Sequence, residues 1–347
     1  MRMGMREGAA EQDPTAEWQA MVDLGASHEE FRELSEALKA GGPPPSGPSE
    51  LARSPLVIDT DLGGDPDDAV ALVVAARTVP ELALVITSDE CKGERARFAR
   101  YLLDLLGRPD VPVVAGSDLG NTRYFCVEGL TPDEVPPQAT DVLSAVQSVC
   151  LNTTARKVRW VGIGPVSNLS SLLSHDPGLA ERLAVTQMGG ALAYRDPTRA
   201  EHNFRLDPEA AIHLLGAVKR PTLVVSDVTF NPAIEITTDS PIYRRLSDSV
   251  NPPAWAGVLR EHMDRWFARF YGGTMQHDAL TLAAALQWPG VRFGRERVVL
   301  DDQARMSRSP DGFEIKVSIS ADYADFTAWL ANRVSQPQVA PSPADAI

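Results

Sequence analysis

Five aspartates crowd one short segment of this chain. They are Asp59, Asp61, Asp65, Asp67 and Asp68, which fall within ten consecutive residues. Carboxylates this close repel one another unless a cation binds between them. Oxygen ligands favour a hard ion, and several aspartates on a flexible loop suit Ca²⁺ better than Mg²⁺. A helix cap and a solvated turn would explain one or two of these aspartates, but not five.

The residues around the aspartates predict a strand, a tight turn and a helix. Residues 56–58 are apolar and end at Asp59, as expected for a short buried strand. Gly63, Gly64 and Pro66 favour a tight turn, and the apolar run 69–76 favours a helix. Ligands of open α/β sheets bind in the crevice beyond the carboxyl ends of the strands. The sequence therefore places the aspartates at a ligand-binding edge.

Composition excludes several classes of function. The formal charge of −14 argues against nucleic acid and against an anionic membrane as partners, and 44% hydrophobic residues support a sizeable core. The three cysteines, Cys91, Cys126 and Cys150, have neither metal-ligand spacing nor an even number, so we expect no disulfide framework. The N-terminus lacks the apolar core of a signal peptide, and no apolar run could span a bilayer. We expect a cytoplasmic protein.

The chain divides into three predicted parts. Residues 1–54 form a polar, partly flexible extension with one possible short helix at 28–40 and a Gly/Pro-rich linker at 41–49. Residues 55–334 alternate strands and helices, and residues 335–347 form a flexible tail. The alternation predicts a single α/β domain with a mostly parallel central sheet and helices on both faces. The further strands are expected at 82–87, 111–115, 158–163, 183–188 and 222–226, and helices near 95–106, 166–173 and 208–217.

Three further segments carry polar residues at the ends of predicted elements. Residues 162–168 follow a strand and open a helix, but their glycine spacing fits neither common nucleotide-phosphate motif. Glu201 and Asn203 precede a helix and suit binding of vicinal hydroxyls, because one accepts and the other donates hydrogen bonds. His277 and Asp278 enter an apolar helix. Taken alone, His277 is better explained as a histidine packed at the start of a helix than as a catalytic residue.

Together these segments resemble the inosine–uridine nucleoside hydrolases. Residues 59–72 resemble the N-terminal signature of that family, and four later segments resemble it in the same order. They are residues 164–168, residues 188–190, residues 201–203 with 207–211, and residues 277–278. The resemblance implies hydrolysis of the N-glycosidic bond of a small-molecule ribonucleoside, giving ribose and free base. It also implies a homo-oligomer, either a dimer or a tetramer.

The resemblance assigns roles to individual residues. Asp61, Asp68, Asp278 and the main-chain carbonyl of Ser167 would hold Ca²⁺, and Asp61 would also deprotonate the attacking water. Asp67, Glu201 and Asn203 would bind ribose, and His277 would protonate the leaving base. This chemistry is coherent, because glycosidic hydrolysis passes through an oxocarbenium-like state that an acidic pocket stabilises. A histidine titrates near neutrality, as a leaving-group acid should.

The chain departs from the family pattern at three places. Two extra residues stand between Asp61 and Asp67, so Asp65 is either an extra ligand or a spectator. Asp89 and Glu90 stand where the family has Gly-Asn, and His202 stands where it has an aromatic residue. We expect Asp89 and His202 to contact the substrate.

Two other functions compete with this interpretation. The Asp59-Thr60-Asp61 segment after a strand is similar to the haloacid-dehalogenase phosphotransferases, with Asp59 as nucleophile. That family leaves Asp67, Asp68 and Asp278 unexplained. A non-catalytic relative that binds a ribosyl ligand or a protein partner around a structural Ca²⁺ is the second alternative, which His277 disfavours.

Overall fold

The computed structural model describes residues 14–28, 31–41, 49–248 and 252–335. The chain divides into two compact units, Met1–Arg53 and Ser54–Ile347. The predicted linker and the C-terminal tail fall almost entirely outside the described residues. No described helix combines the length and the apolar character needed to cross a membrane. Each of the three cysteines is buried and free.

The described residues of the smaller unit form two α-helices, whereas the sequence predicted one. They are α1 (Pro14–Ser27) and α2 (Arg32–Gly41), and the Ser35 hydroxyl of α2 donates a hydrogen bond of 2.9 Å to the Val22 carbonyl of α1. The prediction missed α1 because its apolar residues do not recur on one face, which is the signal that reveals a helix in a sequence.

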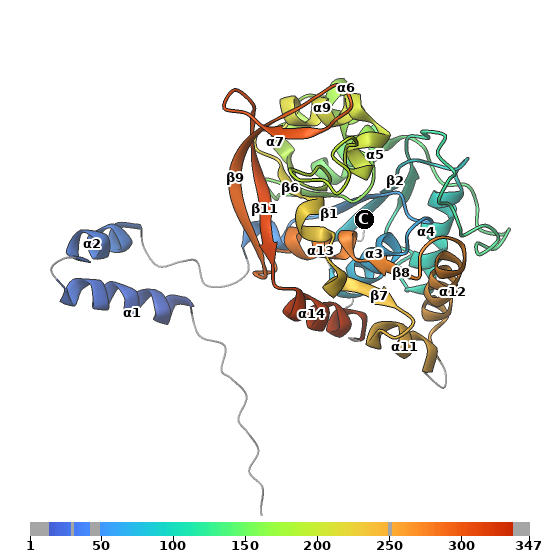
Figure 1. Cartoon of the computed structure of the whole chain (residues 1–347), viewed down its shortest axis with the longest axis horizontal. Coiled ribbons are helices and arrows are strands. Elements are labelled where there is room, and N and C mark those ends of the chain that lie inside the picture. Colours follow the sequence, from blue (N-terminus) through green and yellow to red (C-terminus); the bar gives the residue numbers. More distant parts are fainter. Residues whose placement is uncertain (1–13, 29–30, 42–48, 249–251, 336–347) are drawn as a thin grey trace, which may run out of the picture. The chain divides into compact units, whose positions relative to one another are not determined.

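A nine-stranded sheet forms the centre of the larger unit (Figure 1). Its order is β10-β9-β11-β6-β5-β4-β1-β2-β3, and every pair from β11 to β3 is parallel. The strands are β1 (Leu56–Thr60), β2 (Leu82–Thr87), β3 (Val113–Ala115), β4 (Val158–Gly162), β5 (Leu183–Met188), β6 (Thr222–Val224), β9 (Val291–Leu300), β10 (Met306–Arg308) and β11 (Phe313–Ala321). The predicted mostly parallel sheet is confirmed.

The end of the chain adds the antiparallel part. Strand β9 runs antiparallel to both β10 and β11 at one edge of the sheet. The sequence analysis assigned no strands there. A second sheet pairs β7 (Glu235–Thr237) with β8 (Gly273–Met275). Strand β8 ends two residues before His277.

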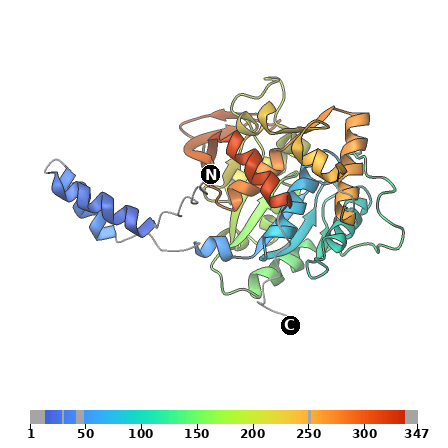
Figure 2. The ribbon, with the colours of Figure 1, turned by 90° about the horizontal axis from the view of Figure 1, so that it is seen from below.

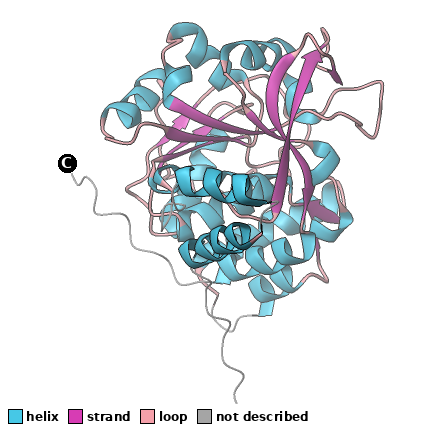
Figure 3. Cartoon of the chain, turned by 90° about the vertical axis from the view of Figure 1, so that its left-hand side faces the viewer, coloured by secondary structure: helices cyan, strands magenta, loops and turns pink. Residues whose placement is uncertain are grey.

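Helices cover both faces of the central sheet, as predicted (Figures 2 and 3). Helix α3 contacts both α13 and α14, while α6 contacts both α5 and α9. The described α-helices of the larger unit are α3 (Asp67–Thr78), α4 (Glu94–Leu105), α5 (Val142–Leu151), α6 (Ser167–His175), α7 (Leu179–Arg182), α8 (His202–Leu206), α9 (Pro208–Ala217), α10 (Ser226–Thr229), α11 (Pro241–Asp248), α12 (Ala254–Arg269), α13 (His277–Ala285) and α14 (Tyr323–Ser335). Short 3-10 helices lie at Glu50–Arg53 in the smaller unit and at Pro232–Ile234 in the larger one.

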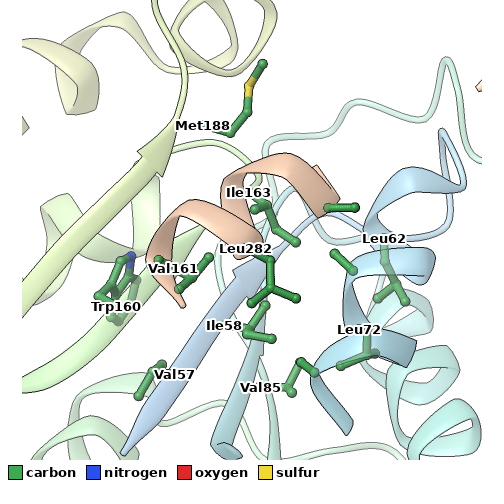
Figure 4. Packing of buried hydrophobic residues seen from close by; sticks show 14 of the residues in the cluster. Val57, Ile58, Leu62, Leu72, Val85, Trp160, Val161, Ile163, Met188 and Leu282 are labelled. Carbon is green, nitrogen blue, oxygen red and sulfur yellow. The ribbon is translucent and has the colours of Figure 1, made fainter. Parts of the chain in front are cut away.

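The core beneath the carboxyl edge joins α3 and α13 to the central strands (Figure 4). Ile58 of β1, Val161 of β4, Leu72 of α3 and Leu282 of α13 are all fully buried in one cluster. Burying each such side chain contributes about 1.5–3 kcal/mol. This packing fixes the first turns of α3 and α13 against the ends of the strands.

We expect the residues before Ala52 to be dispensable for catalysis, because the 54–347 unit carries all the predicted site residues. A chain shortened to begin at Ala52 should keep the kcat/KM of the full chain to within about two-fold, since surface changes outside the core usually have small effects. Steady-state kinetics and a melting curve for both chains check this. A shortened chain that melts like the full one but has lost turnover would refute it.

Candidate active site

Three buried carboxylates meet where two helices begin. Asp67 and Asp68 lie in the first turn of α3, and Asp278 lies in the first turn of α13. One oxygen from each lies within 4.8 Å of the others, and their side chains are 3–5% exposed. The Asp278 main-chain N–H donates to Asp67 Oδ2 at 3.3 Å, and the Thr60 hydroxyl donates to Asp68 Oδ1 at 2.5 Å. This donor set, made of oxygen alone, fits a divalent cation.

Two more carboxylates act on this trio. Burial, then repulsion by Asp68, raises the pKa of Asp61 well above its usual range. Burial raises the pKa of Asp65 to about 8, against a lowering contribution from the hydrogen bond donated by the Thr274 hydroxyl. Burial followed by repulsion from Asp67 raises the pKa of Asp68 to about 7. Burial and mutual repulsion thus disfavour the ionised form of these carboxyl groups, and a cation bound among them would favour it.

One buried guanidinium braces the aspartate turn. Arg95 of α4 is 2% exposed, and its Nη1 donates to the main-chain carbonyls of Asp61 and Leu62. Its Nε donates to the Asp89 carbonyl at 2.6 Å, and its Nη2 lies 3.7 Å from the Asp89 carboxylate. Arg95 therefore joins the end of β1 to the end of β2. The sequence analysis did not single it out, because a lone arginine in an amphipathic helix carries no signal of such a role.

Asp59 is sealed beneath the site. Its side chain is 1% exposed, and its Oδ1 accepts a hydrogen bond of 2.8 Å from Asn168 Nδ2. Burial raises the pKa of Asp59 to about 8. A nucleophile must reach its substrate, so this burial argues against the phosphotransferase alternative. The Asn168 Oδ1 accepts hydrogen bonds from the Ser117 N–H and hydroxyl, so the 162–168 segment is engaged with protein groups instead of a phosphate.

Glu201 and Asn203 tie α8 to the ends of β4 and β5. The Glu201 carboxylate accepts hydrogen bonds from three main-chain N–H groups, those of Gly190, Asn203 and Phe204, at 3.0–3.2 Å. Burial raises the pKa of Glu201, against the opposing effect of these hydrogen bonds. The Asn203 amide donates to the carbonyls of Ile163 and Met188. Both residues therefore lie at the carboxyl edge of the sheet.

Asp89 holds a neighbouring loop in place. It has a left-handed φ of 48° and is fully buried. Its carboxylate accepts hydrogen bonds from the Asn121 side-chain amide at 2.9 Å and the Asn121 N–H at 3.3 Å, besides lying near Arg95. Glu90 turns away from the site, because it accepts from the Thr87 hydroxyl and the Ala96 N–H. The contacts of Asp89 are thus with protein groups.

The two candidate histidines are both held neutral. Burial, then the charge of Arg195, lowers the pKa of His277 to about 3, and its Nδ1 lies 2.7 Å from the Thr229 hydroxyl. Burial, then the charge of Arg205, lowers the pKa of His202 to about 4. The His202 Nδ1 accepts a hydrogen bond from Arg205, so its ring proton resides on Nε2. This low pKa differs from the near-neutral value expected of a leaving-group acid, and the role of His277 as that acid stays a prediction.

Comparison with known proteins identifies the family. Residues 56–327 match the model of the inosine–uridine preferring nucleoside hydrolases. The chain belongs to this family. A pyrimidine-specific ribonucleoside hydrolase, RihA, of Salmonella choleraesuis is 34% identical over 317 residues, covering 81% of this chain and 98% of the relative. The RihA of Salmonella paratyphi B is 28% identical with the same coverage.

Solved nucleoside hydrolase structures share the fold. A plant nucleoside hydrolase superposes with a TM-score of 0.69 at 19% identity, covering 82% of this chain and all of the other. A purine-preferring ribonucleoside hydrolase from Gardnerella vaginalis gives 0.67 at 22% identity, with 81% and 98% covered. The predicted resemblance is confirmed, and this nucleoside hydrolase family member is an enzyme of the N-glycosidase class.

Within this nucleoside hydrolase fold, the trio of close carboxylates contains Asp67, for which the sequence analysis expected a ribose contact. Ser167, expected as a main-chain ligand, begins α6, and its hydroxyl donates to Asp207 at 2.6 Å. The backbone before α6 also approaches Asp61. A Cβ at Gly164 would lie 2.8 Å from Asp61 Oδ1, so the backbone at Ile163 and Gly164 passes close to that carboxylate. The Ile163 carbonyl is therefore a second candidate beside Ser167.

Proposed function

We propose that this protein hydrolyses the N-glycosidic bond of a ribonucleoside in a Ca²⁺-dependent reaction, giving ribose and free base. The observation that carries the proposal is the buried trio of Asp67, Asp68 and Asp278 at the carboxyl edge, in a chain that belongs to the nucleoside hydrolase family. Such a cluster of carboxylates costs free energy in the metal-free protein, and a cation would offset that cost.

The ion would be held by Asp61, Asp68 and Asp278, with a main-chain carbonyl from Ser167 or Ile163. Asp67 lies close enough to serve as a further ligand or as the first contact to the sugar. The oxygen-only donor set and its number of carboxylates suit Ca²⁺. When bound, such an ion supplies positive charge that lowers the pKa of a nearby water.

The protein side chains supply the remaining chemistry. Asp61, the half-buried carboxylate beside the trio, accepts the proton of the attacking water as the water oxygen bonds to C1′. The surrounding carboxylates stabilise the positive charge that develops on the sugar ring. Glu201 and Asn203 orient ribose hydroxyls from the ends of β4 and β5 at the same carboxyl edge, and His202 borders the substrate. The C1′–N bond breaks and the base leaves with its electron pair.

His277 is the candidate acid for that leaving base. Replacing it with Ala should slow hydrolysis of a nucleoside with a poor leaving group by about 10²–10⁴-fold, the usual value of general-acid assistance. It should barely affect p-nitrophenyl riboside, whose leaving group departs without a proton. Steady-state kinetics on both substrates check this. Equal losses on both would indicate a binding role, and a loss confined to His202→Ala would move the acid to His202.

A panel of nucleosides tests the proposed function. Pyrimidine ribonucleosides come first, because the curated relatives named above are pyrimidine-specific. Purine, modified and nicotinamide ribosides complete the panel, with free ribose as the readout. Release of ribose from at least one nucleoside is expected. Binding without release from any member would favour the non-catalytic alternative. The predicted dimer or tetramer is checked separately by light scattering.

A further inference from the structure

A stacked arginine stands beside His277. The guanidinium carbon of Arg195 lies 4.4 Å from the centroid of the Phe230 ring and 4.8 Å from that of Tyr194. The Phe230 ring stacks in turn on His277, with centroids 6.1 Å apart and an interplanar angle of 15°. Phe230 is 46% exposed, so this large ring is not there to fill the core. Cation, phenyl ring and imidazole thus form one continuous group on the side of His277.

The loop that carries Arg195 is anchored in this position. Both carboxylate oxygens of Asp227 accept hydrogen bonds from it, one from the Leu192 N–H at 2.9 Å and one from the Ala193 N–H at 2.7 Å. Asp227 belongs to α10, and Phe230 follows α10 directly. The same short segment therefore fixes the loop and supplies the ring on which Arg195 lies, which pre-organises the cation.

The charge of Arg195 is directed at the site. No ion pair among the described residues engages its guanidinium. Arg195 lowers the pKa of His277, after burial, and also that of His202, after burial and Arg205. Arg199 lowers the pKa of His202 less than Arg195 does, and it is not among the groups that lower the pKa of His277. Arg199 lies on the same exposed loop, and no described aromatic ring stacks with it. Both arginines are charged and exposed, and they differ in that only Arg195 lies against described aromatic rings.

We propose that Arg195 stabilises the negative charge that develops on the departing base, and so directs the enzyme toward nucleosides whose planar base leaves as an anion. This inference rests on the proposed function. The C1′–N electron pair moves to the base, the water oxygen forms the C1′–O bond, and Asp61 takes the water proton. The base anion then gains a proton through His277 or from solvent. A guanidinium remains charged throughout, and its planar face and donors suit a planar heteroaromatic anion.

The dependence of rate on the leaving group tests this role. Arg195→Gln, Arg195→Lys and the control Arg199→Gln are compared with the unaltered enzyme on uridine, 5-fluorouridine and p-nitrophenyl riboside. We expect Arg195→Gln to lower kcat/KM for uridine by about 10-fold or more, below the 10²–10³ typical of a fully enclosed donor. The loss on p-nitrophenyl riboside should be under about three-fold. Arg195→Lys should recover only part of the rate, because lysine keeps the charge but lacks the planar face, and Arg199→Gln should match the unaltered enzyme.

The same substitution in a His277→Ala variant shows whether Arg195 acts on the leaving base directly or only through His277. In His277→Ala, adding Arg195→Gln should still produce a further loss that grows as the leaving group worsens. The proposal is overturned if this further loss is absent, if Arg195→Gln slows all three substrates equally, or if Arg199→Gln has the same effect. Should the unaltered enzyme release ribose from no nucleoside, the proposed function fails as well. Should it release ribose while Arg195→Gln leaves the leaving-group dependence unchanged, this inference alone fails.

Discussion

Asp61→Asn is expected to lower kcat by at least about 10³-fold, because the substitution removes the proposed base and one metal ligand together. General-base assistance alone contributes about 10²–10⁴-fold. The turn itself should survive, since Arg95 hydrogen-bonds to the main-chain carbonyl of residue 61 and not to its carboxylate. A loss of rate would then report on chemistry instead of folding. Stopped or discontinuous assays with the best nucleoside measure it.

Asp65→Asn provides the matched comparison for Asp61→Asn. Asp65 lies in the same turn, and its carboxylate accepts the hydrogen bond of the Thr274 hydroxyl. If Asp65 is a spectator, its substitution should cost less than about ten-fold in kcat, since an exchanged hydrogen bond is worth about 0.5–1.5 kcal/mol. A metal content and kcat equal to the unaltered enzyme in Asp61→Asn would contradict the role assigned to Asp61.

Ca²⁺ is expected to raise the melting temperature by a few degrees, which a melting curve resolves. Ligand binding to the folded state alone at 100 times Kd stabilises it by about 2.7 kcal/mol. With about 2.1 cal/mol/K of unfolding entropy per residue, this corresponds to roughly 4 °C for a chain of this size. Melting curves with chelator, with Ca²⁺ and with Mg²⁺ measure the effect, and the increment from Mg²⁺ should be smaller because its ligand geometry is stricter.

Asp278→Asn is the control for the Ca²⁺ effect, because it should not lower the stability of the metal-free protein but should remove the stabilisation by Ca²⁺. Burial raises the pKa of Asp278 well above its usual range, followed by repulsion from Asp67 and Asp68. Removing this charge should therefore leave the metal-free protein at least as stable as the unaltered one, while abolishing the Ca²⁺ increment. The same Ca²⁺ increment in both proteins, or none in either, would contradict a cation site at this trio.

Local patterns in the sequence predicted the parallel part of the fold. The expected strands at 82–87 and 183–188 are β2 and β5, because buried strands between turn residues carry a strong signal. The sequence analysis did not predict strands β9, β10 and β11, because exposed residues interrupt their apolar pattern. Their placement depends on pairing across the sheet, which no local pattern reveals.

The sequence predicted most of the residues of the candidate site, but it did not predict the hydrogen bonds that hold them in place. Asp68 and Asp278, two of the three expected metal-binding aspartates, lie together with Asp67, which was expected to bind ribose, because α3 and α13 begin close to each other. No local pattern predicts these hydrogen bonds, because Arg95 donates to the carbonyl of Asp61, 34 residues earlier, and Asn168 donates to Asp59, 109 residues earlier. The neutral histidines likewise follow from burial and from arginines of other segments, which only the folded chain brings together.

The most direct test of the proposed reaction measures base and ribose together from one nucleoside, with the protein stripped of metal and then titrated with Ca²⁺. The mechanism predicts equal amounts of base and ribose, no turnover in the chelated protein, recovery as Ca²⁺ saturates the site, and no recovery in Asp61→Asn. A protein that binds Ca²⁺ and nucleoside at this site yet frees neither product, or that frees both at full rate in the presence of chelator, would contradict it.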